Sequence, residues 1–160
     1  MDVFAQQKVK NTSSTLENLK HSYLNGIYFA KIRELKEHEK IDKIHLEKLK
    51  EEIKLDGILK IPIAVDKNTN IILDGHHRFH ALKELKYSKI PVVFVDYRSP
   101  EIQVQGWRNE KVSKEDVINA GLSNKKLPPK TSKHMVKINN KLEHIKAIEK
   151  QINVPLKKLK

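Results

Sequence analysis

The stretch over residues 71–80, Ile-Ile-Leu-Asp-Gly-His-His-Arg-Phe-His, most constrains how this chain can fold. Its apolar start predicts a buried strand, and the Asp-Gly pair predicts a sharp turn into a helix. We expect Asp74 to cap that helix, and Gly75 to supply the turn and leave room for a ligand. Three side chains with basic nitrogens follow at the positive end of the helix dipole: His76, His77 and Arg78. This pattern favours a phosphate site; the alternative is a capped helix whose surface histidines bind nothing.

Hydrophobic patterning predicts alternating strands and helices around this turn. Strands are expected where β-branched and aromatic residues cluster, over 27–35, 61–65, 71–73, 90–96 and 102–107. Helices are expected from Asp42 to a stop at Gly57, after Asp74, over 113–120 between Ser113 and Gly121, and along the tail from 140 until Pro155. The strand-helix-strand order over 71–96 predicts a right-handed crossover. The chain is therefore predicted to be a small α/β domain of α+β character, in which helices flank a mixed sheet.

The composition sets the domain count and the class of ligand. The 160 residues suffice for one domain with its own core, and the absence of cysteine excludes disulfides and a thiolate metal site. We expect a loosely attached segment over 1–24, the main domain over 25–139, and a basic amphipathic helix and tail over 140–160. No apolar stretch reaches membrane-spanning length, so the expectation is a soluble, cytoplasmic protein without membrane contact. The net charge of +12 suits a polyanion or a small phosphorylated ligand.

Three polar clusters stand at predicted loops or element ends, where binding groups are commonly presented. They are residues 37–39 (Glu-His-Glu), residues 74–78 and residues 130–134 (Lys-Thr-Ser-Lys-His). The last cluster offers hydroxyl, ammonium and imidazole groups to a carboxylate or phosphate, although by itself it is more typical of a solvated loop. His76 and His80 share a helix face, but no third ligand accompanies them, so a zinc site is not expected.

The Asp-Gly-His-His-Arg box after a strand resembles the ParB/sulfiredoxin-like superfamily, whose members hold nucleotide phosphates at this turn. Sulfiredoxin uses a cysteine here, and this chain has none. Chromosome-partitioning ParB proteins add a helix-turn-helix, and no such pair is evident after residue 110. The free L-serine kinases are more similar, with four matches in the same order: His38-Glu39, the box at 74–78, Trp107, and Pro-Lys-Thr-Ser-Lys-His at 129–134. Lys133 stands where that branch has arginine.

This resemblance implies transfer of a phosphoryl group from ATP or ADP, with Mg²⁺, to the hydroxyl of free L-serine, giving O-phospho-L-serine. It implies Glu39 as the general base, and Asp74 as the residue that orients Mg²⁺ or the attacking hydroxyl. Gly75, His76, His77 and Arg78 would hold the nucleotide phosphates. The implied substrate-binding residues are His38, Trp107, Lys130, Thr131, Ser132, Lys133 and His134. The alternative is a non-catalytic ParB-like nucleotide- or DNA-binding protein; nucleic acid is the less favoured partner, and the oligomeric state stays open.

Overall fold

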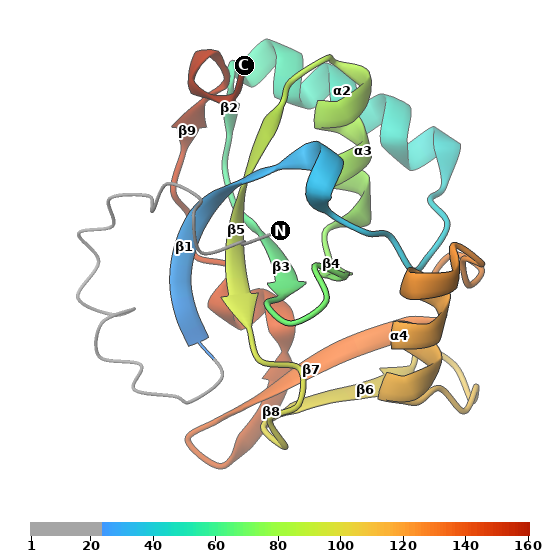
Figure 1. The fold of residues 1–160 in the computed structure, drawn as a ribbon. Coiled ribbons are helices and arrows are strands. Elements are labelled where there is room, and N and C mark those ends of the chain that lie inside the picture. The colour runs from blue at the N-terminus through green and yellow to red at the C-terminus, as the bar shows by residue number, and fades with distance from the viewer. Residues whose placement is uncertain (1–23) are drawn as a thin grey trace.

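The computed structural model describes residues 24–160, with side chains from residue 27 onward (Figure 1). The N-terminal segment expected over 1–24 lies outside this part, apart from Leu24, which begins the first strand. The elements in order are β1 (Leu24–Lys31), η2 (Ile32–Glu34), α2 (Lys43–Asp56), β2 (Ile58–Leu59), β3 (Ile63–Asp66), β4 (Ile72–Asp74), α3 (His76–Glu84), β5 (Lys89–Val95), β6 (Ile102–Gly106), α4 (Lys114–Ser123), β7 (Ser132–Ile138), β8 (Lys141–His144), η3 (Ile145–Ile148), β9 (Val154–Pro155) and η4 (Leu156–Leu159).

A four-stranded mixed sheet in the order β1-β5-β3-β4 forms the centre of the fold. Strands β3 and β5 are parallel, with Ile63 opposite Val92, whereas β1 and β4 pair antiparallel at the two edges. The apolar run of β5 suits its inner position, because both faces of that strand are covered. The predicted α+β class with a mixed sheet is therefore confirmed.

The parallel pair of strands is not the pair that the sequence predicted. We expected residues 71–73 and 90–96 to be joined through the helix as one parallel unit, but β4 does not pair with β5. Instead β4 folds back antiparallel on β3 through the turn at 67–70, and β3 is the parallel neighbour of β5. The turn is held by Asp66, whose carboxylate accepts hydrogen bonds from the Thr69 N–H and hydroxyl. This hairpin places the end of β4 at the edge of the sheet, where α3 begins.

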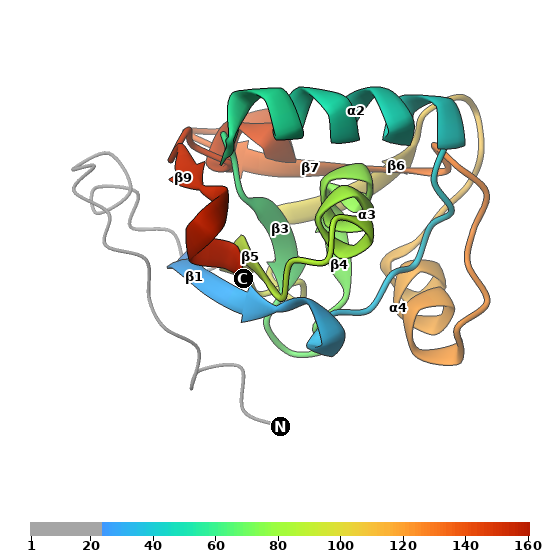
Figure 2. The ribbon, with the colours of Figure 1, turned by 90° about the horizontal axis from the view of Figure 1, so that it is seen from above.

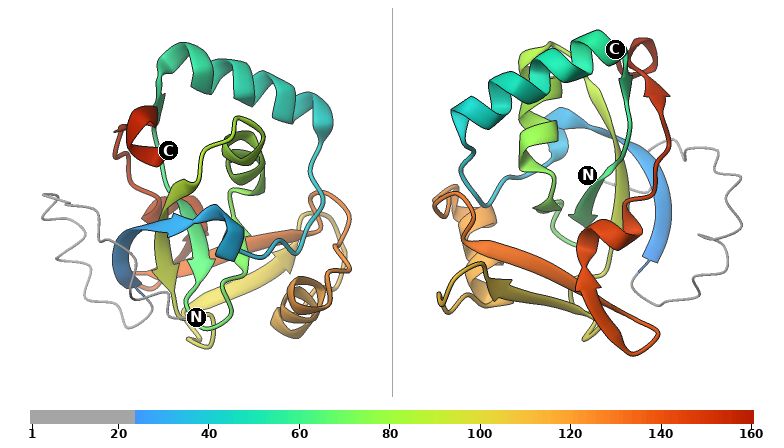
Figure 3. Two further views of the ribbon diagram at one scale, coloured as in Figure 1. Left: turned by 45° about the horizontal axis from the view of Figure 1, so that its top comes forward. Right: turned by 180° about the vertical axis from the view of Figure 1, so that it is seen from behind.

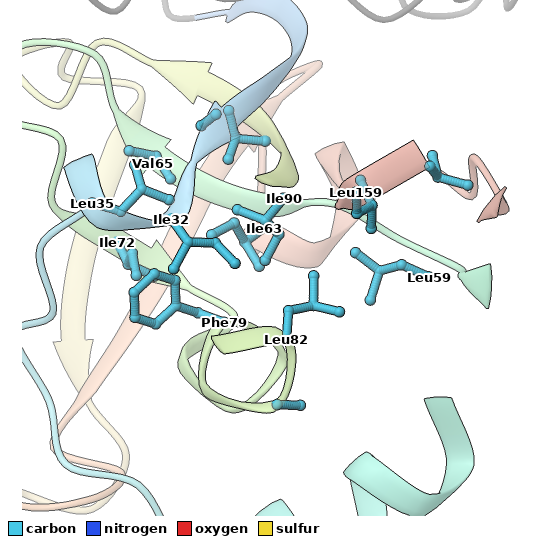
Figure 4. Packing of buried hydrophobic residues seen from close by; sticks show 14 of the residues in the cluster. Ile32, Leu35, Leu59, Ile63, Val65, Ile72, Phe79, Leu82, Ile90 and Leu159 are labelled. Atoms are coloured by element: carbon cyan, nitrogen blue, oxygen red, sulfur yellow. The ribbon is translucent and has the colours of Figure 1, made fainter. Parts of the chain in front are cut away.

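The sheet separates two hydrophobic cores. Alternate residues along β3 point to opposite faces, so Ile63 contributes to one core and Ala64 to the other. The first core lies under α3 and α2, and Figure 4 shows Phe79 and Leu82 of α3 pointing toward the sheet. The second core is covered by the antiparallel sheet β6-β7-β8, by α4 and by η3. Figures 2 and 3 show α2 lying across α3.

The ends of α2 and the start of α4 follow the predicted caps, whereas the end of α4 does not. Asp42 caps α2 by accepting hydrogen bonds from two backbone N–H groups, and Gly57 ends it with φ +69°. Ser113 begins α4 in a capping box. That helix continues past the expected stop at Gly121 and ends at Asn124, which has φ +59°. Gly121 instead allows close packing of α4 against Ile71, since an added Cβ would lie 2.6 Å from the Ile71 side chain.

The prediction of a C-terminal helix over 140–155 is wrong. Residues 139 and 140, both Asn with positive φ, form a two-residue hairpin loop between β7 and β8. The chain then passes through η3 to a short strand, β9, which pairs with β2. Apolar residues of this tail enter different cores: Ile145 and Ile148 enter the second, and Leu156 enters the first. A straight helix with one apolar face cannot reach both cores, so the tail is part of the domain.

Candidate active site

The site begins at the turn between β4 and α3. Asp74 is the last residue of β4, and Gly75 is the N-cap of α3, with φ +102° and no side-chain cap. The prediction that Asp74 caps the helix is therefore wrong; its Oδ2 lies 3.7 Å from the Arg78 Nη2. The first intrahelical hydrogen bond runs from the Phe79 N–H to the Gly75 carbonyl. The N–H groups of residues 76–78 thus precede the helical ladder and can donate to an anion.

Gly75 is required for a reason that the sequence did not reveal. A Cβ at this position would lie 2.3 Å from the Ile63 Cγ2, so the missing side chain makes room for the core beneath the turn. The left-handed backbone adds a second constraint, because residues with a Cβ rarely adopt it.

Replacing Gly75 by Ala is expected to lower the free energy of unfolding by roughly 2–5 kcal/mol, through backbone strain and overpacking against Ile63. Gly57→Ala is the matched control, because Gly57 has φ +69° but nothing within 4 Å of an added Cβ. The control should lose only about 1–2 kcal/mol from the left-handed backbone. Urea unfolding of the three proteins measures both values; equal losses would show that Ile63 is not the obstacle.

A cavity of about 650 Å³ joins this turn to the two other polar clusters. Most predicted site residues line it: Glu39, Asp74, Gly75, His76, His77, Arg78, Trp107, Lys130, Ser132 and His134. Three do not: His38, Thr131 and Lys133. His38 is fully buried behind the wall, the Thr131 hydroxyl donates to the Pro128 carbonyl, and the Lys133 ammonium lies over the Trp107 ring. His45 and Glu52 of α2, with His144 and Lys146 of the tail, also line the cavity and were not predicted.

Glu39 is held by hydrogen bonds to the polar cluster at residues 130–134. Its Oε1 accepts hydrogen bonds from the N–H groups of Thr131 (3.0 Å) and Ser132 (2.9 Å), and it also lies 3.0 Å from the Ser132 hydroxyl. A parallel β-bridge between Glu39 and Leu127 also holds the backbone around these two residues side by side. Burial raises the pKa of this carboxyl, and the hydrogen bonds from Ser132 and Thr131 oppose the rise. A carboxylate with elevated proton affinity at the wall of a cavity is suited to accept a proton.

Burial favours the neutral form of the two histidines at the helix start, His76 and His77. Burial lowers the pKa of His76 far below its ordinary value, and that of His77 to a smaller extent. His77 stacks on His45 of α2 with ring centroids 4.2 Å apart, and its Nε2 accepts the Asp42 N–H. These imidazoles therefore shape the cavity and link α2 to α3, and positive charge comes from Arg78 and the lysines.

Arg78 is anchored by a residue that the sequence analysis missed. Its Nη2 donates to Glu149 Oε1 (2.9 Å) and to the Pro62 carbonyl (3.1 Å). The Glu149 side chain is 0% exposed. Burial and Asp74 raise the pKa of Glu149, and Arg78 opposes them. The sequence offered one signal for this role, because Glu149 is a charged residue among the regularly spaced apolar residues Ile145, Ile148 and Ile152.

Trp107 lies at the wall of the cavity and not in a core, with 47% of its surface exposed. Its indole N–H donates to the Ser132 carbonyl (3.1 Å), and the ring lies beside His144. His134 of β7 is buried, and its Nε2 lies 2.8 Å from the Tyr97 hydroxyl. Trp107 and the start of β7 are thus joined directly, and both line the same cavity as the start of α3.

The family assignment follows from comparison with known proteins. Residues 6–107, well over half of the chain, match the ParB N-terminal domain. The chain belongs to the ParB N-terminal domain family. This match confirms the resemblance inferred from the box at 74–78. It ends at Trp107, so the β7 segment and Glu149 complete the cavity from beyond the matched ParB N-terminal domain region.

Individual relatives of this ParB N-terminal domain protein cover shorter stretches. It is 50% identical over 46 residues to a ParB-like protein of Sulfolobus acidocaldarius, which is 29% of this chain and 23% of that protein. It is 36% identical over 74 residues to an ATP-dependent L-serine kinase of Staphylothermus marinus, which is 44% of this chain and 29% of that protein. The chain thus matches less than a third of the length of either relative.

The fold is also that of a solved free serine kinase in complex with AMP. The superposition has a TM-score of 0.73 at 16% identity, and it covers 88% of this chain and 98% of the kinase chain.

Within residues 24–160, no three His, Cys, Asp or Glu side chains are grouped to hold a metal ion. The Asp74 Oδ2 is buried and has no hydrogen-bond partner, which fits a single carboxylate ligand to a Mg²⁺ ion that also binds phosphate oxygens. No helix of the described region is long and apolar enough to cross a membrane.

Proposed function

We propose that this protein is a nucleotide-dependent kinase that phosphorylates the hydroxyl of free L-serine, giving O-phospho-L-serine. The observation that carries the proposal is the arrangement within one cavity. Glu39, anchored by residues 131 and 132, forms one wall, and the start of α3 forms another. A base and an anion-binding helix start that share a cavity suit phosphoryl transfer to an alcohol. The names of relatives that match part of the chain support the same activity.

The donor side of the proposed site is the turn at 74–78. The free N–H groups of residues 76–78 would donate to phosphate oxygens, and Arg78, Lys130 and Lys146 line the same cavity as cations. Mg²⁺ would be held by Asp74 together with the nucleotide, and when bound it would neutralise charge on the transferred group. ATP and ADP are both candidate donors.

The acceptor side of the proposed site is the wall formed by Trp107 and β7. Lys130 would bind the carboxylate of the amino acid, and the half-exposed Trp107 ring would cover the serine. Thr131 and Lys133, which do not line the cavity, would act by holding the segment and the Trp107 ring in place.

Glu39 is the proposed general base. A serine hydroxyl is a weak nucleophile, and removal of its proton as the oxygen attacks the phosphorus typically accelerates transfer by roughly 10²–10⁴-fold. In the proposed reaction the hydroxyl O–H bond breaks and its proton passes to the Glu39 carboxylate, while the serine oxygen forms a bond to the terminal phosphorus of the nucleotide. The bond between that phosphorus and the bridging oxygen breaks, and the nucleotide leaves with one phosphate fewer.

The test is incubation of purified protein with L-serine, Mg²⁺ and either ATP or ADP, followed by mass spectrometry for O-phospho-L-serine. We expect product with at least one nucleotide, and none when L-alanine, which lacks the hydroxyl, replaces L-serine. Nucleotide-dependent thermal stabilisation without product would contradict the kinase and favour the non-catalytic ParB-like nucleotide-binding alternative.

A further inference from the structure

Glu39 is connected through Ser132 to a buried histidine. The Ser132 hydroxyl lies 3.0 Å from Glu39 Oε1 and 2.8 Å from His38 Nε2. On its other side, His38 Nδ1 lies 2.7 Å from the Ile72 carbonyl oxygen. His38 is 0% exposed and lies outside the cavity lining, so it acts behind the wall and not on a ligand.

The hydrogen atoms in this chain of contacts can be counted. A carbonyl oxygen only accepts, so His38 Nδ1 carries a hydrogen and donates it to Ile72. Burial lowers the pKa of His38 to about 4, so its Nε2 is an unprotonated acceptor at pH 7. Glu39 Oε1, when ionised, is also only an acceptor. The Ser132 hydroxyl has one hydrogen and two acceptors, and one of its two short contacts therefore lacks a hydrogen.

We propose that Ser132 and His38 are positioning residues for Glu39: the Ser132 hydroxyl donates to Glu39 while that carboxylate is ionised, and turns to His38 when Glu39 takes up a proton. This inference rests on the proposed function, with Glu39 as the base. The charge-assisted hydrogen bond to an ionised carboxylate is the stronger of the two, which decides the first orientation. Once protonated, Oε1 carries less charge, and the hydroxyl hydrogen is released to the imidazole.

The consequence is a stronger base. His38 Nε2 gains a hydrogen bond only after Glu39 is protonated, so His38 stabilises the protonated carboxyl relative to the ionised one. In the proposed reaction, the proton lost by the acceptor hydroxyl goes to the Glu39 carboxylate. The Ser132 O–H bond stays intact and only rotates. No other proton, electron or reactant is needed.

The groups that surround His38 do not supply a competing charge. His76 of α3 and His134 of β7 face its ring, with centroids at 4.7 and 5.7 Å. Burial lowers the pKa of both, so both are neutral at pH 7. Glu39 itself accepts hydrogen bonds from N–H and hydroxyl groups of residues 130–132. Ser132 is therefore the route by which His38 influences Glu39.

Carbon-13 NMR of the Glu39 carboxyl tests the proposal, with the signal assigned by its absence in Glu39→Gln. Ser132→Ala removes a donor to the carboxylate, and we expect its titration midpoint to rise by about 0.5–1 pH unit. His38→Asn keeps a donor for Ile72 but cannot reach Ser132, so the hydroxyl stays with Glu39 and the midpoint should fall by a similar amount. Ser132→Thr keeps the hydroxyl and should titrate like the wild type.

The double variant Ser132→Ala/His38→Asn closes a thermodynamic cycle, and His38→Asn should cause no further shift once Ser132 is Ala. Shifts in the same direction in both single variants, or no shift in Ser132→Ala, would overturn the proposal. Should His38→Asn fail to fold, the titration midpoints of Ser132→Ala and Ser132→Thr still test the role of the Ser132 hydroxyl, because both variants keep His38. The titration needs no turnover, so its outcome is separate from the assay for O-phospho-L-serine.

Discussion

Glu39→Gln lowers turnover at least about a hundredfold and leaves nucleotide binding intact; this is the first of the two largest effects that we expect. Gln keeps the size of the side chain and an oxygen for the N–H groups of Thr131 and Ser132. It cannot accept a proton from the acceptor hydroxyl at neutral pH. Initial rates of O-phospho-L-serine formation, with nucleotide affinity from isothermal titration calorimetry, separate loss of chemistry from loss of binding.

Glu52→Gln is the matched control for this prediction. Glu52 lines the same cavity from α2 and is exposed, so the same substitution there should leave turnover within a few fold of wild type. Glu37 is the other carboxylate of the early cluster, but it contacts His80 and Lys126 and does not line the cavity. Unchanged turnover in Glu39→Gln would remove Glu39 from the mechanism.

Features encoded by neighbouring residues were predictable from the sequence. Asp42 and Ser113 cap helices because a short polar side chain satisfies N–H groups within a few residues of itself. The apolar run of β5 identifies a covered strand without knowledge of its partners. The structure brings members of the three polar clusters, Glu39, the turn at 74–78 and Ser132, to one cavity.

Features that depend on distant packing were not predictable. The spacing of Ile145 and Ile148 suits a helix, but the hairpin loop at 139–140 and the division of the tail between two cores decide its path. Glu149 is separated from Arg78 by 71 residues, and no local pattern connects them. Asp74 satisfied the local rule for an N-cap, but the antiparallel pairing of β4 with β3 keeps it in the strand.

Arg78→Ala is expected to cause the largest loss of stability, together with weaker nucleotide binding. The substitution removes the charged partner of Glu149, whose side chain is 0% exposed. Breaking a buried pair in this way typically costs about 3–5 kcal/mol, because the remaining carboxyl must either stay buried as an unpaired charge or take up a proton. It also removes a cation from the proposed phosphate site. Chemical denaturation and nucleotide titration of the variant measure the two effects, and unchanged nucleotide affinity would mean that the phosphate site has been misplaced.

The stability loss in Arg78→Ala should depend on pH in a definite direction. Burial and Asp74 raise the pKa of Glu149, and removing Arg78, which opposes them, raises it further. The folded variant then binds a proton that the unfolded chain, with an ordinary carboxyl pKa of about 4.3, has already released. Stability from this group is complete below the unfolded pKa and is lost as pH rises, so the loss should be larger at about pH 8 than at about pH 5. Adding Glu149→Gln should abolish this pH dependence, whereas its persistence would assign the effect to another group.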